Sequence, residues 1–270
     1  MPTKKMRLDV LMLSRELAPS RSKAQALIMA GQVRVNGQLV HKPATKVDSS
    51  AEIRIARGPR FVSRGGEKLL AALTAFPIRV EGRICADVGA STGGFTDCLL
   101  QHGAAKVYAI DVGKGILDWK LRNDTRVVVM EGTNARYVES LPEPISLATI
   151  DASFISLKVL LPAVQKWLSS SGEVVSLIKP QFEAGRREVS RGKGVIRDAE
   201  IHRRVLREIL TFAMDIGFSP LGLIRSPVLG PKGNVEFLAW FSETESGRRS
   251  EDVDAIIHAV VPLEEKRMVE

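Results

Sequence analysis

Asp87-Val-Gly89-Ala-Ser-Thr-Gly93-Gly94-Phe95 is a glycine-rich turn set between two patterned segments. The apolar run before it predicts a buried strand over 84–88, and the spacing after it predicts a helix over 95–102. Gly89 permits a tight turn, and the Gly93-Gly94 pair lets a ligand approach the backbone closely. Because a helix N-terminus favours anionic groups, we expect a small-molecule site where this strand ends and the helix begins.

Strands continue to alternate with helices on both sides of this turn. This order predicts a doubly wound, Rossmann-like α/β sheet. The expected strands span 84–88, 106–111, 127–130, 147–151, 173–179 and 235–241, and the expected helices span 95–102, 157–168 and 200–217, with a further helix beginning at Glu67.

The spacing of the turn's glycines indicates which ligand it takes. Gly-x-x-x-Gly differs from the Gly-x-Gly-x-x-Gly spacing of dinucleotide sites, and with its leading acid it favours S-adenosylmethionine. The amino-acid part of that ligand would lie over the turn, and Asp111, at the end of the second strand, could hold its ribose hydroxyls. A glycine-rich turn can also be purely structural. The expected cofactor residues are Asp87, Gly89, Ser91, Gly93, Gly94, Phe95, Asp111 and Asn134, the last facing the adenine.

Two charged residues come at strand ends beyond this turn. Asp151 ends the strand over 147–151, and Lys179 ends the strand over 173–179, just before a proline. Ligands of open α/β sheets bind at the carboxyl ends of the strands, so both fall at the expected edge. Glu236, in the last expected strand, and Lys68, near the start of a helix, are further candidates. A lysine beside an apolar interior can accept a proton from a hydroxyl, although each of these can also be an ordinary surface charge.

The positive charge is concentrated near the N-terminus. The whole chain carries a formal charge of +8, but residues 1–64 alone have 13 Lys and Arg against 4 acids, a net +9, so the remaining 206 residues have a net charge of −1. Such an arm favours a polyanionic partner, with nucleic acid ahead of a membrane surface. A merely soluble basic face is the alternative.

The basic arm shows the pattern of a compact α+β module. We expect helices over 7–17 and from Ser20 or Ser22 to about residue 30, then a hairpin with Asn36-Gly37 at its turn and a last strand over 53–55. Arg7-Leu-Asp9, Ser20-Arg21 and Leu27-Ile-x-x-Gly31-x-Val-x-Val-Asn-Gly37 resemble the S-four-like RNA-binding domain. The resemblance implies that Arg7, Arg21, Lys23, Arg34 and Lys42 face RNA phosphates, and we expect the same of Arg64 in the Gly/Pro/Arg-rich linker.

The expected domain organisation follows from these patterns. Residues 1–57 form the S-four-like domain, 58–66 a linker, 67–245 a methyltransferase domain that uses S-adenosylmethionine, and 246–270 a tail without a known motif.

At the level of the whole chain, Lys68, Asp151, Lys179 and Glu236 occur in the order of the Lys-Asp-Lys-Glu tetrad of FtsJ-like ribose 2′-O-methyltransferases. Together with Ser63-Arg-Gly-Gly-Glu-Lys68 and Asp151-Ala-Ser-Phe-Ile-Ser156, the chain resembles the TlyA family of rRNA cytidine-2′-O-methyltransferases, also labelled hemolysins. The resemblance implies that Lys179 is the base or its activator and that the other three orient the hydroxyl. It also implies ribosomal RNA or ribosomal subunits as partner and no metal requirement. We add a second RNA contact at the basic run 186–207, whose net charge is +5.

Three other functions remain open from the sequence. A base methyltransferase is the nearest, but Asp151-Ala-Ser-Phe154 differs from the Asn/Asp-Pro-Pro-aromatic motif of exocyclic amino methylation, and Cys85 and Cys98 look like core residues rather than nucleophiles. An inactive RNA-binding or ribosome-assembly protein is another. A membrane-lytic protein is the third, although the apolar stretch 145–164 contains two charges, so we expect no stable membrane insertion. Two cysteines indicate a reducing compartment, the cytoplasm.

Overall fold

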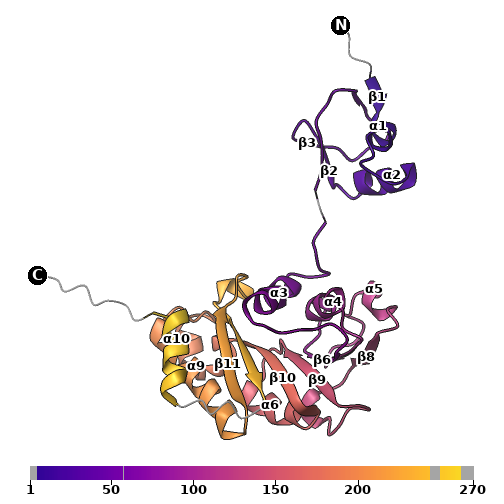
Figure 1. The fold of residues 1–270 in the computed structure, drawn as a ribbon. Coiled ribbons are helices and arrows are strands. Elements are labelled where there is room, and N and C mark those ends of the chain that lie inside the picture. The colour runs from indigo at the N-terminus through magenta and orange to yellow at the C-terminus, as the bar shows by residue number, and fades with distance from the viewer. Residues whose placement is uncertain (1–4, 57, 244–249, 263–270) are drawn as a thin grey trace, which may run out of the picture. The chain divides into compact units, whose positions relative to one another are not determined.

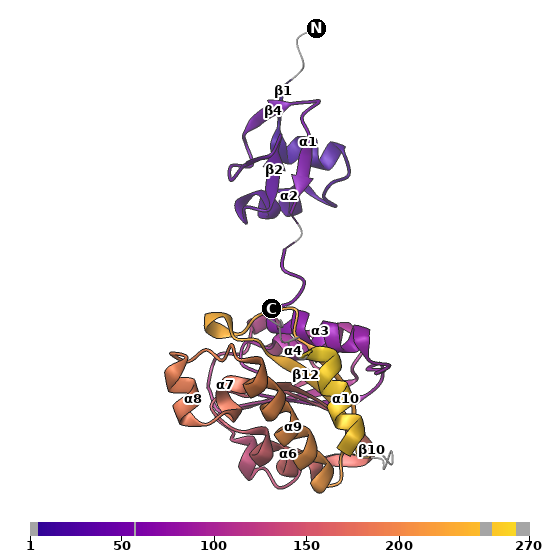
Figure 2. The ribbon, with the colours of Figure 1, turned by 90° about the vertical axis from the view of Figure 1, so that its left-hand side faces the viewer.

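The computed structural model describes residues 5–56, 58–243 and 250–262, and the chain divides into two compact units. Unit 1 is Met1–Arg60 and unit 2 is Phe61–Glu270 (Figures 1 and 2). Each unit packs around hydrophobic residues of its own.

Unit 1 joins two helices to short strands. Strands β3, β2 and β5 form one antiparallel sheet, β1 pairs with β4 in another, and Leu8, Met12 and Ile28 are fully buried in the core. Its elements are β1 (Lys5–Arg7), α1 (Leu8–Ser14), α2 (Arg21–Met29), β2 (Val33–Val35), β3 (Gln38–Leu39), β4 (Lys46–Asp48) and β5 (Ile53–Ile55).

Local chemistry explains most of unit 1. Asn36 and Gly37 both have positive φ, as a two-residue hairpin turn requires, and the Ser20 hydroxyl accepts a hydrogen bond from the Lys23 N–H at 3.1 Å, which caps α2. The helix expected over 7–17 is shorter, because Glu16 has a φ of +56° and its N–H bonds to the Leu13 carbonyl. The β1–β4 pair was not expected from the sequence.

Unit 2 is built on a seven-stranded sheet, which confirms the predicted doubly wound α/β class. The strand order is β11-β12-β10-β9-β6-β7-β8; neighbours from β10 to β8 are parallel, and β12 runs antiparallel to both β10 and β11. From β6 the chain adds β7 and β8 on one side, and it then returns to add β9 on the other side of β6. Ligands bind at this switch point between β6 and β9 in such folds. The strands are β6 (Ile84–Val88), β7 (Lys106–Asp111), β8 (Val127–Glu131), β9 (Ile145–Ile150), β10 (Leu168–Ile178), β11 (Ser219–Arg225) and β12 (Phe237–Ser242).

Helices cover both faces of this sheet (Figure 1). Successive strand residues point to opposite faces, so Cys85 belongs to a hydrophobic cluster with side chains of α3, α4 and α5. Ala86 belongs to a second cluster, with side chains of α6, α9 and α10. The helices are α3 (Gly65–Ala75), α4 (Gly94–Gln101), α5 (Trp119–Arg122), α6 (Leu157–Gln165), α7 (Pro180–Glu183), α8 (Arg186–Arg191), α9 (Ala199–Asp215) and α10 (Ser250–Val260), with 3₁₀ turns η1 (Ala135–Tyr137) and η2 (Pro231–Gly233).

Several boundaries differ from those expected. Glu236 lies one residue before β12 rather than inside it, and β10 begins at Leu168, within the expected helix 157–168, with an irregular register before Glu173. Strand β11 was not expected, because Ser219–Arg225 contains Pro220 and Gly222, which weaken a strand pattern.

The expected linker and tail also differ from the structure. Phe61 is 2% exposed and packs against Gly66, where an added methyl group would lie 2.2 Å from the ring, so residues 61–66 belong to unit 2. Within the expected tail 246–270, the described residues form α10, which contacts α9 and buries Val253 and Ile257. The helical spacing of these apolar residues was the missed signal.

Candidate active site

Two cavities meet at the carboxyl ends of the central strands of unit 2. The first, called here the tetrad cavity, has a volume of about 300 Å³, and the second, the Asp111 cavity, of about 540 Å³. Gly89, Ser91, Asp151 and Ser153 line both. A ligand in one cavity would therefore lie against a ligand in the other.

All four predicted catalytic residues line the tetrad cavity, from elements far apart in the sequence. They form two ion pairs: Lys68 Nζ lies 2.6 Å from Glu236 Oε2, and Lys179 Nζ lies 2.6 Å from Asp151 Oδ1. Both lysines and Glu236 are buried. Lys179 also donates to the Asp151 carbonyl at 3.3 Å and to the Ser153 hydroxyl at 3.0 Å. Each buried charge is thus compensated, and removal of one partner would leave the other uncompensated.

Glu236 is fixed by two residues that the sequence reasoning missed. The Gln181 side chain on α7 donates to Glu236 Oε1 at 3.0 Å. Gly230 packs directly on the carboxylate, since an added methyl group would lie 2.0 Å from Glu236 Oε1. The position of Gln181, two residues after Lys179, and the glycine between Leu229 and Pro231 were the available signals.

The glycines of the turn after β6 make different contacts. Gly89 has a φ of +81°, and an added methyl group there would lie 2.8 Å from the Asp151 carbonyl, so the turn presses against the end of β9. Gly93 instead packs against Leu121 of α5 and lines neither cavity. Gly94 and Phe95, at the start of α4, line the tetrad cavity.

Asp87 was expected to contact the cofactor, but it lies at the end of β6 and lines neither cavity. Its fully buried carboxylate accepts hydrogen bonds from the hydroxyls of Thr96 at 2.7 Å and Thr149 at 3.0 Å. Burial raises the pKa of Asp87 to about 6, although both threonine hydrogen bonds act to lower it. The carboxylate therefore ties β6 to α4 and β9.

The Asp111 cavity contains the other predicted cofactor residues. The Asp111 carboxylate accepts from the Ser91 N–H at 2.8 Å and the Gly113 N–H at 2.7 Å, which anchors it to the glycine turn. Asn134 also lines the cavity, and its side chain accepts from the Arg136 N–H at 3.1 Å. The apolar wall includes Ile110, Val112, Ile116, Ala135 and Leu160.

An exposed aromatic ring stands where the two cavities meet, and the sequence reasoning gave it no role. Phe154 is 90% exposed with a φ of +65°, an uncommon conformation for a bulky residue. Its ring lies 4.8 Å from that of Phe182, and Lys179 Nζ lies 5.7 Å from the Phe182 ring. Phe154 lines the Asp111 cavity and Phe182 the tetrad cavity, so this pair spans the junction.

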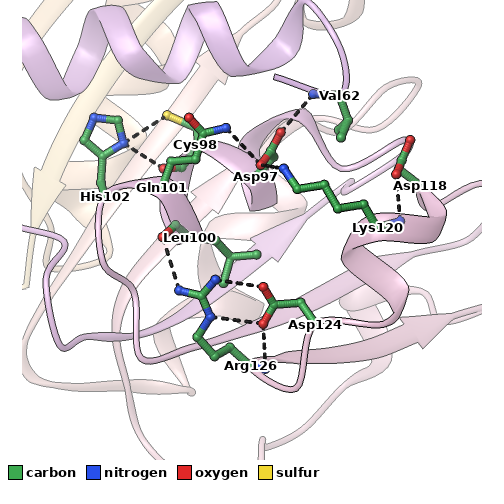
Figure 3. Close-up of polar contacts among 10 residues, drawn as sticks. All are labelled: Val62, Asp97, Cys98, Leu100, Gln101, His102, Asp118, Lys120, Asp124 and Arg126. Carbon is green, nitrogen blue, oxygen red and sulfur yellow. Dashed lines mark hydrogen bonds and ion pairs between the residues drawn. The ribbon is translucent and has the colours of Figure 1, made fainter. Parts of the chain in front are cut away.

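A network behind the turn fastens the first residues of unit 2 (Figure 3). Asp97 on α4 is 2% exposed; its carboxylate accepts from the Val62 N–H at 2.9 Å, the Gln101 side chain at 3.0 Å and Lys120 at 3.1 Å. Ser63 and Arg64, the next residues, line the tetrad cavity. Asp97 thus holds one wall of that cavity in place.

The predicted RNA-binding residues of unit 1 fall into two groups. Arg7 and Arg21 both pair with buried Asp9, at 2.9 and 3.0 Å, and the Arg7 guanidinium holds the pKa of that carboxyl well below its usual range. Lys23, Arg34 and Lys42 are exposed, with Arg34 donating to the Gly37 carbonyl at 3.0 Å. Arg64 belongs to unit 2, at the tetrad cavity.

The basic run 186–207 is only partly available to a ligand. Arg203 is buried and donates to the carbonyls of Val261 and Pro262. Arg204 pairs with Glu188 and Glu208, and Arg207 pairs with Asp254. Arg203 is thus closed to a ligand, whereas Arg204 and Arg207 are exposed and link α9 to α8 and α10 through their ion pairs. Arg187, Arg191, Lys193 and Arg197 are exposed.

Other expectations concerned cysteines, membranes and metals. Cys85 and Cys98 are buried core residues, as predicted, and burial raises the pKa of Cys85 to about 12. No helix within 5–56, 58–243 or 250–262 has the length and apolarity to cross a membrane. Over the same ranges, no cluster of three His, Cys, Asp or Glu side chains is arranged to hold a metal ion.

Comparison with known sequences identifies the family. The profile of the FtsJ-like methyltransferases matches residues 61–243, and that of the S4 domain matches residues 6–53. The 16S/23S rRNA (cytidine-2′-O)-methyltransferase TlyA of Mycobacterium tuberculosis is 42% identical, over 96% of this chain and 98% of that protein. The chain belongs to the TlyA family of FtsJ-like methyltransferases.

Other relatives agree with this TlyA-family assignment. Hemolysin A of Brachyspira hyodysenteriae is 47% identical, over 87% of this chain and 99% of that protein. A solved structure from Streptococcus thermophilus, provisionally named a hemolysin, is 45% identical, covers 96% of both chains and has a TM-score of 0.71. The resemblance drawn from the sequence, including the S4 domain, is confirmed.

Proposed function

We propose that this protein transfers a methyl group from S-adenosylmethionine to a ribose 2′-hydroxyl, that of a cytidine, in ribosomal RNA. The observation that carries the proposal is the shared edge of the two cavities: Asp151, paired with Lys179 at 2.6 Å, lines both. A donor held in one cavity and a hydroxyl held in the other would therefore meet beside these side chains. The name of the Mycobacterium tuberculosis relative supports the choice of substrate.

The Asp111 cavity fits an adenosyl group. Asp111 offers a carboxylate for ribose hydroxyls, and the apolar side chains around Asn134 offer a surface for an adenine ring. Gly89 lines this cavity, and its φ of +81° and its contact with the Asp151 carbonyl set the turn beside the end of β9. S-adenosylmethionine, when bound, supplies a sulfonium methyl group that is electrophilic without a metal.

The tetrad cavity supplies the groups that a hydroxyl nucleophile needs. As the oxygen–methyl bond forms and the sulfur–methyl bond breaks, Lys179 in its amine form accepts the hydroxyl proton. Asp151 orients Lys179, while Lys68 and Glu236 form a second ion pair in the same cavity and position the ribose. Holding both reactants in line supplies much of the rate enhancement.

The exposed ring of Phe154 suits a nucleobase. A ribose can enter the tetrad cavity only after its nucleotide leaves the RNA stack, and an exposed aromatic face replaces part of the lost stacking. We propose that Phe154, supported by Phe182, stacks on the displaced base. Lys23, Arg34 and Lys42 of unit 1 would hold the surrounding RNA through its phosphates. A cytoplasmic location, which we also propose, suits an rRNA substrate.

The test is methyl transfer from labelled S-adenosylmethionine to purified ribosomal subunits. We expect Lys179→Ala to lower the rate by about 10²- to 10⁴-fold, as loss of a general base does. Exposed Lys166, at the end of α6, provides the control: Lys166→Ala should be as active as the unmodified protein. A Lys179→Ala protein that binds the donor and transfers methyl at the normal rate would refute the role of Lys179.

A further inference from the structure

Two Lys–Gly turns face each other beside the tetrad cavity. Lys193-Gly194 follows α8, and Lys232-Gly233 lies in η2. All four residues have positive φ, +50° and +86° in the first turn and +59° and +85° in the second. The turns are close, because a methyl group added to Gly194 would lie 3.5 Å from Lys232 Nζ. Lysine rarely adopts this backbone conformation, so the surrounding structure must impose it.

Asn234 locks the two turns together. Its side chain is 3% exposed and donates to the Gly194 carbonyl at 3.0 Å and the Pro231 carbonyl at 3.1 Å. The same side chain accepts from the Ile196 N–H at 3.0 Å. The Ile196 carbonyl in turn accepts from His202 Nε2 of α9 at 3.1 Å. One buried amide therefore fixes both lysines to the scaffold of unit 2.

The locked turns adjoin the residues that shape the tetrad cavity. Gly230 and Pro231 line that cavity immediately before Lys232, and Gly230 packs against the Glu236 carboxylate. Lys193 and Lys232 are both exposed, and within the described part of the chain neither side-chain ammonium has a hydrogen-bond or ion-pair partner. In contrast, the two lysines inside the cavity are paired with carboxylates. The rim thus presents two uncompensated positive charges on turns whose backbone is fixed.

We propose that Lys193 and Lys232 clamp a phosphodiester of the RNA backbone next to the target nucleotide. This inference rests on the proposed function. The carbon that bears the ribose 2′-hydroxyl is bonded to the carbon whose 3′-oxygen carries the next phosphate, so a cavity that takes this hydroxyl must have a phosphate near its rim. An ammonium group is a good point-charge donor to such a phosphate, and the rigid turns place two of them without further ordering of the backbone. The clamp is a site for backbone charge, not for base identity.

The test compares variants of the full chain for binding to purified ribosomal subunits at several salt concentrations. We expect Lys193→Gln with Lys232→Gln to weaken binding about tenfold and to lower the salt slope by about 1 to 2. Affinity for S-adenosylmethionine should not change. Lys193→Arg with Lys232→Arg, which keeps the charge, should restore binding.

The matched control removes two charges elsewhere. Arg79 and Lys166 are exposed and precede the first residues of β6 and β10, at the opposite ends of the strands from the cavity. If Arg79→Gln with Lys166→Gln weakens binding as much as the lysine pair does, or if the lysine pair changes nothing, the clamp is refuted. Methyl transfer is measured in the same samples. Failure of the unmodified protein to methylate would refute the proposed function, while the binding comparison still decides the clamp.

Discussion

The buried carboxylate of Asp87 illustrates how a single residue stabilises the site without touching a ligand. It is enclosed by the ends of β6, α4 and β9 and retains two hydroxyl donors, Thr96 and Thr149. Burial nevertheless dominates and raises its pKa to about 6 from an ordinary value of 3.8. The folded protein therefore binds this proton more tightly than the unfolded chain does. The free energy of unfolding must depend on pH through Asp87.

The sign of that dependence gives a prediction for Asp87→Asn. The folded pKa is raised, so the stabilisation by the proton is complete below pH 4 and is lost as the pH rises through 6. Relative to the Asn variant, the unmodified protein should lose up to about 3 kcal/mol of unfolding free energy between pH 4 and pH 7. Denaturant unfolding of both proteins across this range measures it. A difference that stays constant with pH would contradict the buried, titrating carboxylate.

The charged residue types in the sequence predicted which residues form the catalytic site. The sequence did not predict which residues of the glycine turn face the cavities. Lys68, Asp151, Lys179 and Glu236 were predicted together and do line one cavity. Asp87 and Gly93 were grouped with the cofactor residues, yet neither lines a cavity, because a turn motif does not say which of its residues face the ligand. Gln181 and Phe154 act through contacts made only in the folded chain.

Among the elements, α4 joins the glycine turn to the segment that precedes α3. Asp97, in its first turn, accepts the Val62 N–H, and this bond together with buried Phe61 keeps Ser63 and Arg64 at the tetrad cavity. An acidic residue is also favourable in the first turn of a helix. Helix α4 therefore organises both the turn and the cavity wall.

We predict that Asp97→Ala lowers the free energy of unfolding by about 1–3 kcal/mol, because the partly buried Val62 N–H loses its acceptor. Affinity for S-adenosylmethionine should fall as well. Asp97→Asn, which keeps one oxygen acceptor, should lose less. Lys120→Ala should change stability by under about 1 kcal/mol, since Lys120 is 67% exposed in its ion pair. Equal losses in all three variants would contradict the role given to the Val62 bond.

The sequence predicted the central elements better than the peripheral ones. Apolar runs such as 84–88 and 106–111 gave strands β6 and β7 with the expected bounds. β11 contains a proline and a glycine, and its place beside β12 depends on pairing that no local pattern encodes. β1 is three residues long and is a strand because it pairs with β4.

In the whole molecule, the positive charge is divided unevenly between the two units. The +9 excess lies in residues 1–64, and exposed Lys23, Arg34 and Lys42 belong to a unit with its own core. Unit 2 is nearly neutral overall, yet Lys193 and Lys232 present local charge beside the cavity. This distribution suits a protein that binds RNA broadly through one unit and positions a single nucleotide with the other.

The position of the transferred methyl group tests the central claim most directly. Purified ribosomal subunits are incubated with the protein and S-adenosylmethionine, and the RNA is digested to nucleosides for mass spectrometry. We predict a new 2′-O-methylcytidine, in which cleavage of the glycosidic bond leaves the methyl on the sugar, and its absence with Lys179→Ala. A methyl group found on the base, or no new methylated nucleoside, would contradict the account.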